Sequence, residues 1–361
     1  MKLKRFQLIW LMIAIIFLVS ACSPAGQEQQ YADYQRHTDT FFDTFDTLIQ
    51  VIAYTRSEEE FNAYFNQIHQ RFQELHQLYD IYNDYPGVNN IKTVNDQAGM
   101  APVAVHDDLI NLILFAREWH DKTAGRTNIA LGPVLKIWHD YRDEGLFDPS
   151  SAQLPPLEDL EWAAQFTDIH QVEVDEAAGT VYLPDPRMRL DIGGVAKGYA
   201  VELAIREVEA AGLESVIISA GGNVRALGRP FDDERETWTV GLHDPEASMF
   251  ADGNTLLGTV SITNASVVTS GDYQRFYIVD GKPVHHLIDP TTLMPGNYYR
   301  AVTVVIEDSG LADYFSTELF LLPFDDSFAM AESIDGLEAI WVLPDGTIEM
   351  TDGMDEILQL Y

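Results

Sequence analysis

The order in which helical and strand-like segments follow each other most constrains how this chain can fold. Residues 57–82 carry apolar side chains at helical intervals from Phe61 to Phe72, and a second helical pattern covers residues 106–123. From residue 216 onward, short runs rich in β-branched and aromatic residues dominate, several joined by Asp-Gly pairs that favour hairpin turns. Early helices and mostly antiparallel late strands predict an α+β fold, not a doubly wound parallel sheet.

Local patterns predict further elements between these regions. We expect strands at residues 42–53 (broken around Asp46), 171–183 and 189–193, a short helix around residues 134–138, a helix start at Pro155 and Pro156, and one late helix at residues 309–322. No low-complexity linker or internal repeat divides the sequence, so we expect one globular unit with sublobes.

The N-terminus has the pattern of an export signal. Basic residues precede an apolar run at residues 8–19 that is too short to span a bilayer comfortably. The string LVSAC ends at Cys22, the single cysteine, and resembles the lipobox of bacterial lipoproteins, whose cysteine receives lipid. We predict a lipoprotein signal peptide at residues 1–21, a lipid-anchored tether at residues 22–38 and one domain at residues 39–361, placed on the outer face of the bacterial cell membrane.

Charge and cysteine content exclude several classes of protein. The sequence has 57 acidic and 22 basic side chains, a formal net charge of −35. Nucleic-acid binding needs a cationic surface, so we expect no nucleic-acid partner. A polybasic membrane contact is excluded on the same ground, which leaves the lipid as the membrane attachment. With one cysteine, no intramolecular disulfide can form, so the fold depends on its core.

The stretch LDIGGVAKGYAVELA, residues 190–204, combines features of an anion site. Gly193 and Gly194 would let the backbone approach a ligand, and the helix that follows offers free N–H groups. Lys197 lies in the first turn, where the helix dipole disfavours a positive charge. Taken alone, the stretch is better explained as a tight turn with a solvated lysine, because glycine turns before helices are common. It matches neither the Walker nor the dinucleotide glycine spacing.

Two later stretches carry further polar side chains. Asp313 and Thr317 are four residues apart, so on a helix both would offer hard oxygen donors suited to Mg²⁺ from one face. The alternative is that they serve only their own helix. His285 and His286 are adjacent at a strand end, so at most one should enter a given site, where it could act as a base. No metal-binding spacing accompanies them, and a zinc site is not expected there.

In order, these stretches resemble the FAD:protein FMN transferases, the ApbE family of flavin-attaching lipoproteins. Five motifs carry the resemblance, namely LDIGGVAKGYAVE, ISAGGNVRALG, SVVTSGDYQRF, HHLIDPTT and ADYFSTELF. Weaker matches start near Phe41. The resemblance implies an α+β, T-fold-related unit of mostly antiparallel sheet with flanking helices and an FAD cleft between sublobes.

The resemblance also implies an activity and a set of site residues. The family cleaves FAD with Mg²⁺ (Mn²⁺ being an alternative ion) and transfers FMN to a threonine of a partner protein, releasing AMP. The implied FAD contacts are Phe45, Tyr82, Asn128, Ile129, Ala130, Asp191, Lys197, Thr269 and His286. Asp313, Thr317 and the backbone carbonyl of Gly194 are the implied metal ligands. Asp313 and His286 are the implied catalytic residues, with His286 as the base for the acceptor threonine.

Three positions depart from the family pattern. Phe45 stands where a methionine is usual, Asn128 replaces a frequent aspartate, and Leu293 replaces a usual glycine, which puts the local turn in question. None of them removes an implied metal ligand or the lysine.

Other functions remain open on the sequence alone. The same residues would serve an FAD pyrophosphatase that releases FMN and AMP, and a flavin-binding lipoprotein without chemistry is a third alternative. A solute-capture lipoprotein would show two repeated lobes, which the sequence lacks. Acceptors carry an Asp-Ser/Thr-small-Ala-Thr motif, whose nearest match here, DSGLA at residues 308–312, lacks the threonine. The chain is therefore expected to be the transferase and not its acceptor.

Overall fold

The computed structural model of the chain describes residues 31–232, 234–247 and 255–361. The predicted signal peptide and the lipid attachment at Cys22 lie outside these residues. No helix in the described part of the chain combines the length and the apolar character that crossing a membrane requires.

An eight-stranded sheet forms the centre of the molecule, and all its neighbouring strands are antiparallel. In spatial order its strands are β1 (Gln35–Phe41), β2 (Ile49–Thr55), β6 (Val216–Ala220), β7 (Asn223–Leu227), β10 (Ser266–Gly271), β13 (Ala301–Ile306), β14 (Glu338–Val342) and β15 (Ile348–Met350). The α+β prediction is confirmed, with most of these strands supplied by the second half of the chain.

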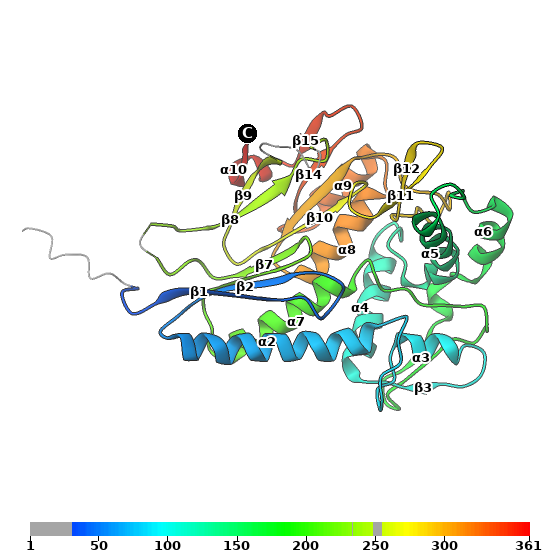
Figure 1. Ribbon diagram of the computed structural model, residues 1–361, viewed down its shortest axis with the longest axis horizontal. Coiled ribbons are helices and arrows are strands. Elements are labelled where there is room, and N and C mark those ends of the chain that lie inside the picture. The colour runs from blue at the N-terminus through cyan, green and yellow to red at the C-terminus, as the bar shows by residue number, and fades with distance from the viewer. Residues whose placement is uncertain (1–30, 233, 248–254) are drawn as a thin grey trace, which may run out of the picture.

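Helices pack mainly on one face of this sheet, whereas the last one, residues 354–357, lies on the opposite face. They are α2 (Glu58–Tyr79), α3 (Ile91–Asp96), α4 (Asp107–Lys122), α5 (Gly132–Phe147), α6 (Leu157–Ala163), α7 (Ala196–Ala210), α8 (Ser309–Phe320), α9 (Phe324–Ser333) and α10 (Met354–Ile357). Figure 1 shows α2 and α7 side by side along the sheet, and α8 packs on β10 and β13. A smaller sheet of β8 (Trp238–His243), β9 (Leu256–Ile262) and β16 (Leu358–Leu360) lies on the opposite side of the main sheet.

Side chains that alternate along the strands allow the main sheet to pack against the helices on one face and against the smaller sheet on the other. In β6, Val216 and Ile218 face the helices, while Ile217 between them faces the smaller sheet. In β13, Val304 and Val305 divide in the same way. Because both faces of the central strands are covered, these strands read as continuous apolar runs in the sequence.

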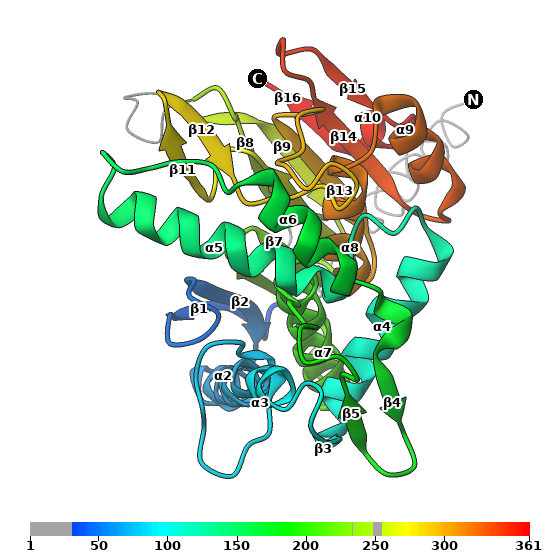
Figure 2. The ribbon, with the colours of Figure 1, turned by 90° about the vertical axis from the view of Figure 1, so that its right-hand side faces the viewer.

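A second lobe packs around its own apolar cluster. It contains α5, α6 and the hairpin of β11 (Phe276–Val279) and β12 (Lys282–His285), which Figure 2 shows next to each other. Trp138 of α5 and Tyr277 of β11 share this cluster. A small sheet of β3 (Val103–Ala104), β5 (Thr180–Tyr182) and β4 (Glu173–Asp175) completes the structure. The predicted sublobes are therefore present.

Several local predictions are confirmed. Ser57 caps α2 by accepting a hydrogen bond from the Glu60 backbone N–H at 3.1 Å. The strand predicted at residues 42–53 is interrupted around Asp46, as expected, where Phe45 and Asp46 have positive φ, but its first part is loop and only residues from Ile49 onward belong to a strand. The main sheet begins at Gln35, however, ahead of the domain start predicted at residue 39, because β1 pairs with β2 from Gln35 onward.

Other predictions are wrong, and long-range contacts explain why. Residues 189–193 form no strand, because the side chain of Asn95 forms hydrogen bonds with both backbone groups of Leu190. Its amide N–H donates to the Leu190 carbonyl at 2.9 Å, and its oxygen accepts from the Leu190 N–H at 2.7 Å. The helix expected around residues 134–138 extends to Phe147. A further helix, α9, follows α8 where one late helix was predicted.

Candidate active site

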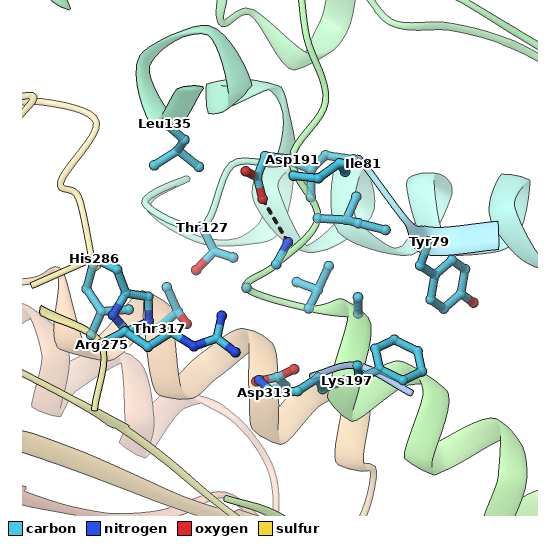
Figure 3. A pocket seen from close by; sticks show the side chains of 18 of the residues that line it. Tyr79, Ile81, Thr127, Leu135, Asp191, Lys197, Arg275, His286, Asp313 and Thr317 are labelled. Atoms are coloured by element: carbon cyan, nitrogen blue, oxygen red, sulfur yellow. Dashed lines mark hydrogen bonds between the residues drawn. The ribbon is translucent and has the colours of Figure 1, made fainter. Parts of the chain in front are cut away.

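A cavity of about 380 Å³ lies between the main sheet with its helices and the second lobe, a size typical of small-molecule sites. The predicted site residues that line it are Phe45, Tyr82, Asn128, Ile129, Asp191, Gly194, Lys197, Thr269, His286, Asp313 and Thr317. Figure 3 labels five of them, namely Asp191, Lys197, His286, Asp313 and Thr317. Ala130 does not line it, because its side chain is 1% exposed and packs into the main core. The structure therefore gathers segments that lie far apart in the sequence around one cavity.

The beginning of α7 forms one wall. Gly193 and Gly194 are exposed to the cavity, and a Cβ on Gly193 would contact only the Asp191 carboxylate, at 3.2 Å. Asp191 Oδ1 accepts a hydrogen bond of 3.0 Å from the Gly193 N–H, which fixes the turn. Lys197 stands in the first turn of α7 and faces the cavity, as predicted. Free N–H groups and a lysine at a helix start together favour an anion.

Asp313 of α8 is the most deeply buried carboxyl group of this site. It is 5% exposed, and its Oδ2 accepts a 2.8 Å hydrogen bond from the backbone N–H of Gly198. Burial raises the pKa of Asp313 from its ordinary value, while the nearby Lys197 charge and the Gly198 N–H act in the opposite direction. Burying an ionised carboxylate costs free energy unless a nearby cation balances its negative charge.

Thr317 lies one helical turn after Asp313 and faces the same cavity. Its Oγ1 is 3.4 Å from Ser270 Oγ, and a Cβ placed on Gly194 would lie 3.8 Å from it. Asp313, Thr317 and Gly194 therefore surround one region of the cavity with oxygen-bearing groups. Carboxylate, hydroxyl and carbonyl oxygens are the donors that Mg²⁺ prefers, so these residues fit that ion.

The two adjacent histidines point in different directions, as the strand geometry predicts. Nε2 of His285 is 2.7 Å from the Gly296 carbonyl, and its ring packs on Phe320. His286 lines the cavity, and burial, with the Arg275 and Lys197 charges adding to it, lowers its pKa to about 3. His286 is therefore neutral near pH 7 and can accept a proton.

His139 of α5 lies between Tyr82 and Asp191 in the cavity lining. Nδ1 of His139 lies 3.9 Å from Asp191 Oδ2 and 3.3 Å from the Tyr82 hydroxyl. Burial lowers the pKa of His139, against the opposing effect of Asp191. His139 thus links the aromatic edge of the cavity to the carboxylate at the α7 turn.

A buried glutamate on α8 anchors the loop that carries Asn128. The carboxylate of Glu318 is fully buried and accepts hydrogen bonds from the backbone N–H groups of Arg126 (3.1 Å) and Thr127 (2.6 Å). Asn128 in turn accepts from the Ala130 N–H and donates to the Thr167 carbonyl at 2.9 Å. Asn128 therefore shapes this wall through neutral hydrogen bonds where an aspartate would add charge.

Charges in the cavity lining are balanced, unlike those of the chain as a whole. The basic lining residues are Arg126, Arg142, Lys197 and Arg275, and the acidic ones are Asp46, Asp80, Asp191 and Asp313. The lining thus has four positive and four negative side chains, whereas the whole sequence has a net charge of −35. The cavity is therefore much less negative than the rest of the protein, which suits an anionic ligand.

Sequence reasoning missed Arg126, His139, Arg275 and Glu318. Arg275 lies within the motif SVVTSGDYQRF, and His139 lies in the earlier part of the chain where the matches to the family are weaker. Neither residue has a local pattern that marks it. Nothing in the sequence near Glu318 indicates that its carboxylate is used nearly 200 positions earlier, at Thr127.

The departures at Phe45 and Leu293 are accommodated. Phe45 has a φ of 54° and packs its ring edge-on against Phe72 and Tyr79, so this position stays apolar. Leu293 adopts a φ of 61°, the left-handed conformation that glycine favours. Its side chain is 7% exposed and its carbonyl accepts from Trp138 Nε1 at 3.0 Å. The turn is kept, and leucine adds apolar packing.

Comparisons with known proteins agree with this geometry. The model of the ApbE family matches residues 45–341. A FAD:protein FMN transferase of Treponema pallidum is 29% identical over 96% of this chain and 93% of its own length. One from Klebsiella pneumoniae is 33% identical over 74% of this chain and 80% of its own length.

Solved structures show the same fold. The crystal structure of the ApbE protein of Thermotoga maritima superposes with a TM-score of 0.76 at 25% identity, covering 90% of this chain and 99% of that one. The apo flavinyl transferase ApbE of Pseudomonas stutzeri gives a TM-score of 0.73 at 22% identity, over 90% and 97% of the two chains. On its sequence and its fold, this chain belongs to the ApbE family.

Proposed function

We infer that this chain is an enzyme that transfers FMN from FAD to acceptor proteins. Relatives that match 96% and 74% of the chain carry the name FAD:protein FMN transferase. The observation that carries the inference is the convergence of Lys197, Asp313 and His286 on one cavity from three separate elements. A binding protein would not require a candidate base beside a cation-binding carboxylate.

Asp313, Thr317 and the Gly194 carbonyl are the proposed ligands of Mg²⁺, with Mn²⁺ as an alternative ion. When bound, the ion would neutralise charge that develops on the pyrophosphate. Lys197 and the free N–H groups at the start of α7 would orient the same pyrophosphate and stabilise its negative charge. This assignment is supported by the oxygen-rich donor set and by the burial of Asp313.

The proposed reaction forms one phosphoester bond and breaks one pyrophosphate bond. An acceptor threonine oxygen bonds to the phosphorus on the FMN side, the bond from that phosphorus to the bridging oxygen breaks, and AMP leaves with that oxygen. The threonine proton passes to His286, which is neutral in the free protein. Negative charge on a bound pyrophosphate would raise the pKa of His286 and make it a better base.

An acceptor assay tests this function. The protein is incubated with FAD, Mg²⁺ and an acceptor domain carrying an Asp-Ser/Thr-small-Ala-Thr motif, and the acceptor is analysed by mass spectrometry. We expect the acceptor threonine to gain one FMN. Release of free FMN and AMP with an unmodified acceptor would instead identify a pyrophosphatase, and unchanged FAD would identify a flavin-binding protein.

We further propose that the enzyme is exported and lipid-anchored through Cys22, so that its acceptors are exported proteins. The support is the apolar run at residues 8–19 followed by LVSAC. Metabolic labelling with an alkyne fatty acid checks this: wild type should be labelled and a Cys22→Ser variant should not. Equal labelling of both proteins would refute the attachment at Cys22.

A further inference from the structure

Metal-binding side chains also gather outside the cavity, where α4 ends beside the segment that leads into β4. His120 and Asp121 lie in the last turn of α4, and His170 lies in a short 3₁₀ helix, Ile169–Gln171. None of the three lines the cavity. One donor atom from each lies within 4.8 Å of the other two.

The Asp121 carboxylate lies between the two imidazole rings. Its Oδ1 is 3.6 Å from Nδ1 of His120 and 3.4 Å from Nε2 of His170. Two ligands bound at about 2.0–2.1 Å to one tetrahedral zinc ion are about 3.3 Å apart. The distances from Asp121 Oδ1 to the two nitrogens are therefore close to the spacing of two ligands on one zinc ion. The His170 side chain is 58% exposed, so it is free to turn and close the remaining gap.

Nδ1 of His120 needs a partner that the protein does not supply. The atom is buried and, among the described residues, makes no hydrogen bond. Buried polar atoms without partners are uncommon, and an unseen ion or water is one explanation for them. A neutral imidazole lone pair facing a carboxylate oxygen is unfavourable unless a cation or a proton lies between them.

The backbone that presents these side chains is held by the core. Ile169 and Val172, on either side of His170, are each 1% exposed. The His170 backbone N–H donates to Asp168 Oδ1 at 3.0 Å, and Arg117 of α4 donates to the Val172 carbonyl at 3.5 Å. The core and these hydrogen bonds therefore keep the two segments close to each other, and a bound ion would tighten their contact.

We propose that His120, Asp121 and His170 bind a divalent transition-metal ion of the Zn²⁺ class, with water completing its coordination. Two imidazoles and one carboxylate suit such ions, whereas the all-oxygen set at Asp313 and Thr317 suits Mg²⁺. The bound ion would fasten residues 169–171 to α4, close to the Thr167 carbonyl that holds Asn128 in the cavity wall. The site is thus a structural clamp behind that wall.

Zinc titration of the full-length protein tests the proposal without flavin or acceptor, so the result is independent of the proposed transferase function. The metal-free protein is titrated with Zn²⁺ in competition with a chromophoric chelator. We expect His120→Ala and His170→Ala each to weaken binding at least tenfold, since even residues that only support ligands cost 10–100-fold when changed. His170→Cys, which supplies a thiolate ligand, should restore most of the affinity.

His106→Asn is the matched control. Nδ1 of His106 lies 3.1 Å from Asp108 Oδ2 at the other end of α4, a histidine–aspartate pair without a second imidazole, and asparagine keeps the helix cap. This variant should bind Zn²⁺ like wild type. Unchanged affinity in His120→Ala and His170→Ala, or an equal loss in His106→Asn, would overturn the proposal and leave the cluster as ion pairs of protonated histidines. Failure of His170→Cys to restore binding lost in His170→Ala would also count against it.

Discussion

Oδ2 of Asp313 accepts a 2.8 Å hydrogen bond from the backbone N–H of Gly198, so the first turn of α7 points at a buried carboxylate on α8. The contact requires glycine, because a Cβ at position 198 would collide with the Ser309 carbonyl and with Cβ of Asp313. The close approach of the two helices therefore places the proposed metal ligand and the anion-binding helix start in one site.

Gly198→Ala should lower both stability and activity. Overpacking of this kind costs typically about 1–3 kcal/mol, and moving α8 away from α7 would displace Asp313 from Lys197. Urea denaturation and the acceptor assay measure the two effects. Glu209→Ala, on the exposed side of α7, serves as the control and should change stability by less than about 0.5 kcal/mol. A fully active and stable Gly198→Ala protein would show that the helix contact is not needed.

Asp313→Asn should separate stability from activity. The raised pKa of Asp313 means that folding disfavours the ionised carboxylate, so a neutral amide should leave the free energy of unfolding equal or higher. The same change removes a charged oxygen donor, so FMN transfer should be lost at every Mg²⁺ concentration tested. Thermal melting and the acceptor assay check the two statements. Undiminished transfer would refute Asp313 as a metal ligand.

The burial of His286 predicts a pH-dependent stability. Its pKa is about 3 in the folded protein and about 6.5 in an unfolded chain. Between these values the unfolded state binds more protons, so the free energy of unfolding should fall as pH drops from about 6.5 towards 3. His286→Gln should reduce this slope, measured by urea denaturation at several pH values. Identical slopes for wild type and His286→Gln would contradict the assignment.

Glu318→Gln should weaken FAD binding through the loop that it positions. Glutamine offers one oxygen for two backbone N–H groups, those of Arg126 and Thr127, and turns an amide donor towards the other. An unsatisfied buried donor costs about 1–3 kcal/mol. We expect KM for FAD to rise more than kcat falls, because Glu318 holds a cavity wall and does not line the cavity. Glu332→Gln, at an exposed glutamate of α9, is the control; a change confined to kcat would argue against a positioning role.

The sequence by itself determined the fold class, most elements and part of the cavity lining. The evidence for them was local: helical periodicity between Ser57 and Tyr79, strand-like runs after residue 216, and five motifs in a fixed order. Such side-chain patterns can be recognised in the sequence before the fold is known. Local patterns also explain why Lys197 and His286 line the cavity as expected. Lys197 follows a helix start, and His286 is the one of two adjacent histidines that points to this side.

Only the tertiary structure decided which distant groups meet. Residues 189–193 have strand composition but form no ladder, because Asn95 satisfies the backbone of Leu190 from another part of the chain. The roles of Glu318 and His139, and the meeting of His120 with His170, likewise depend on contacts between residues far apart in sequence. Local propensity specifies how a segment coils or extends, whereas burial and hydrogen-bond satisfaction are settled only once the segments pack.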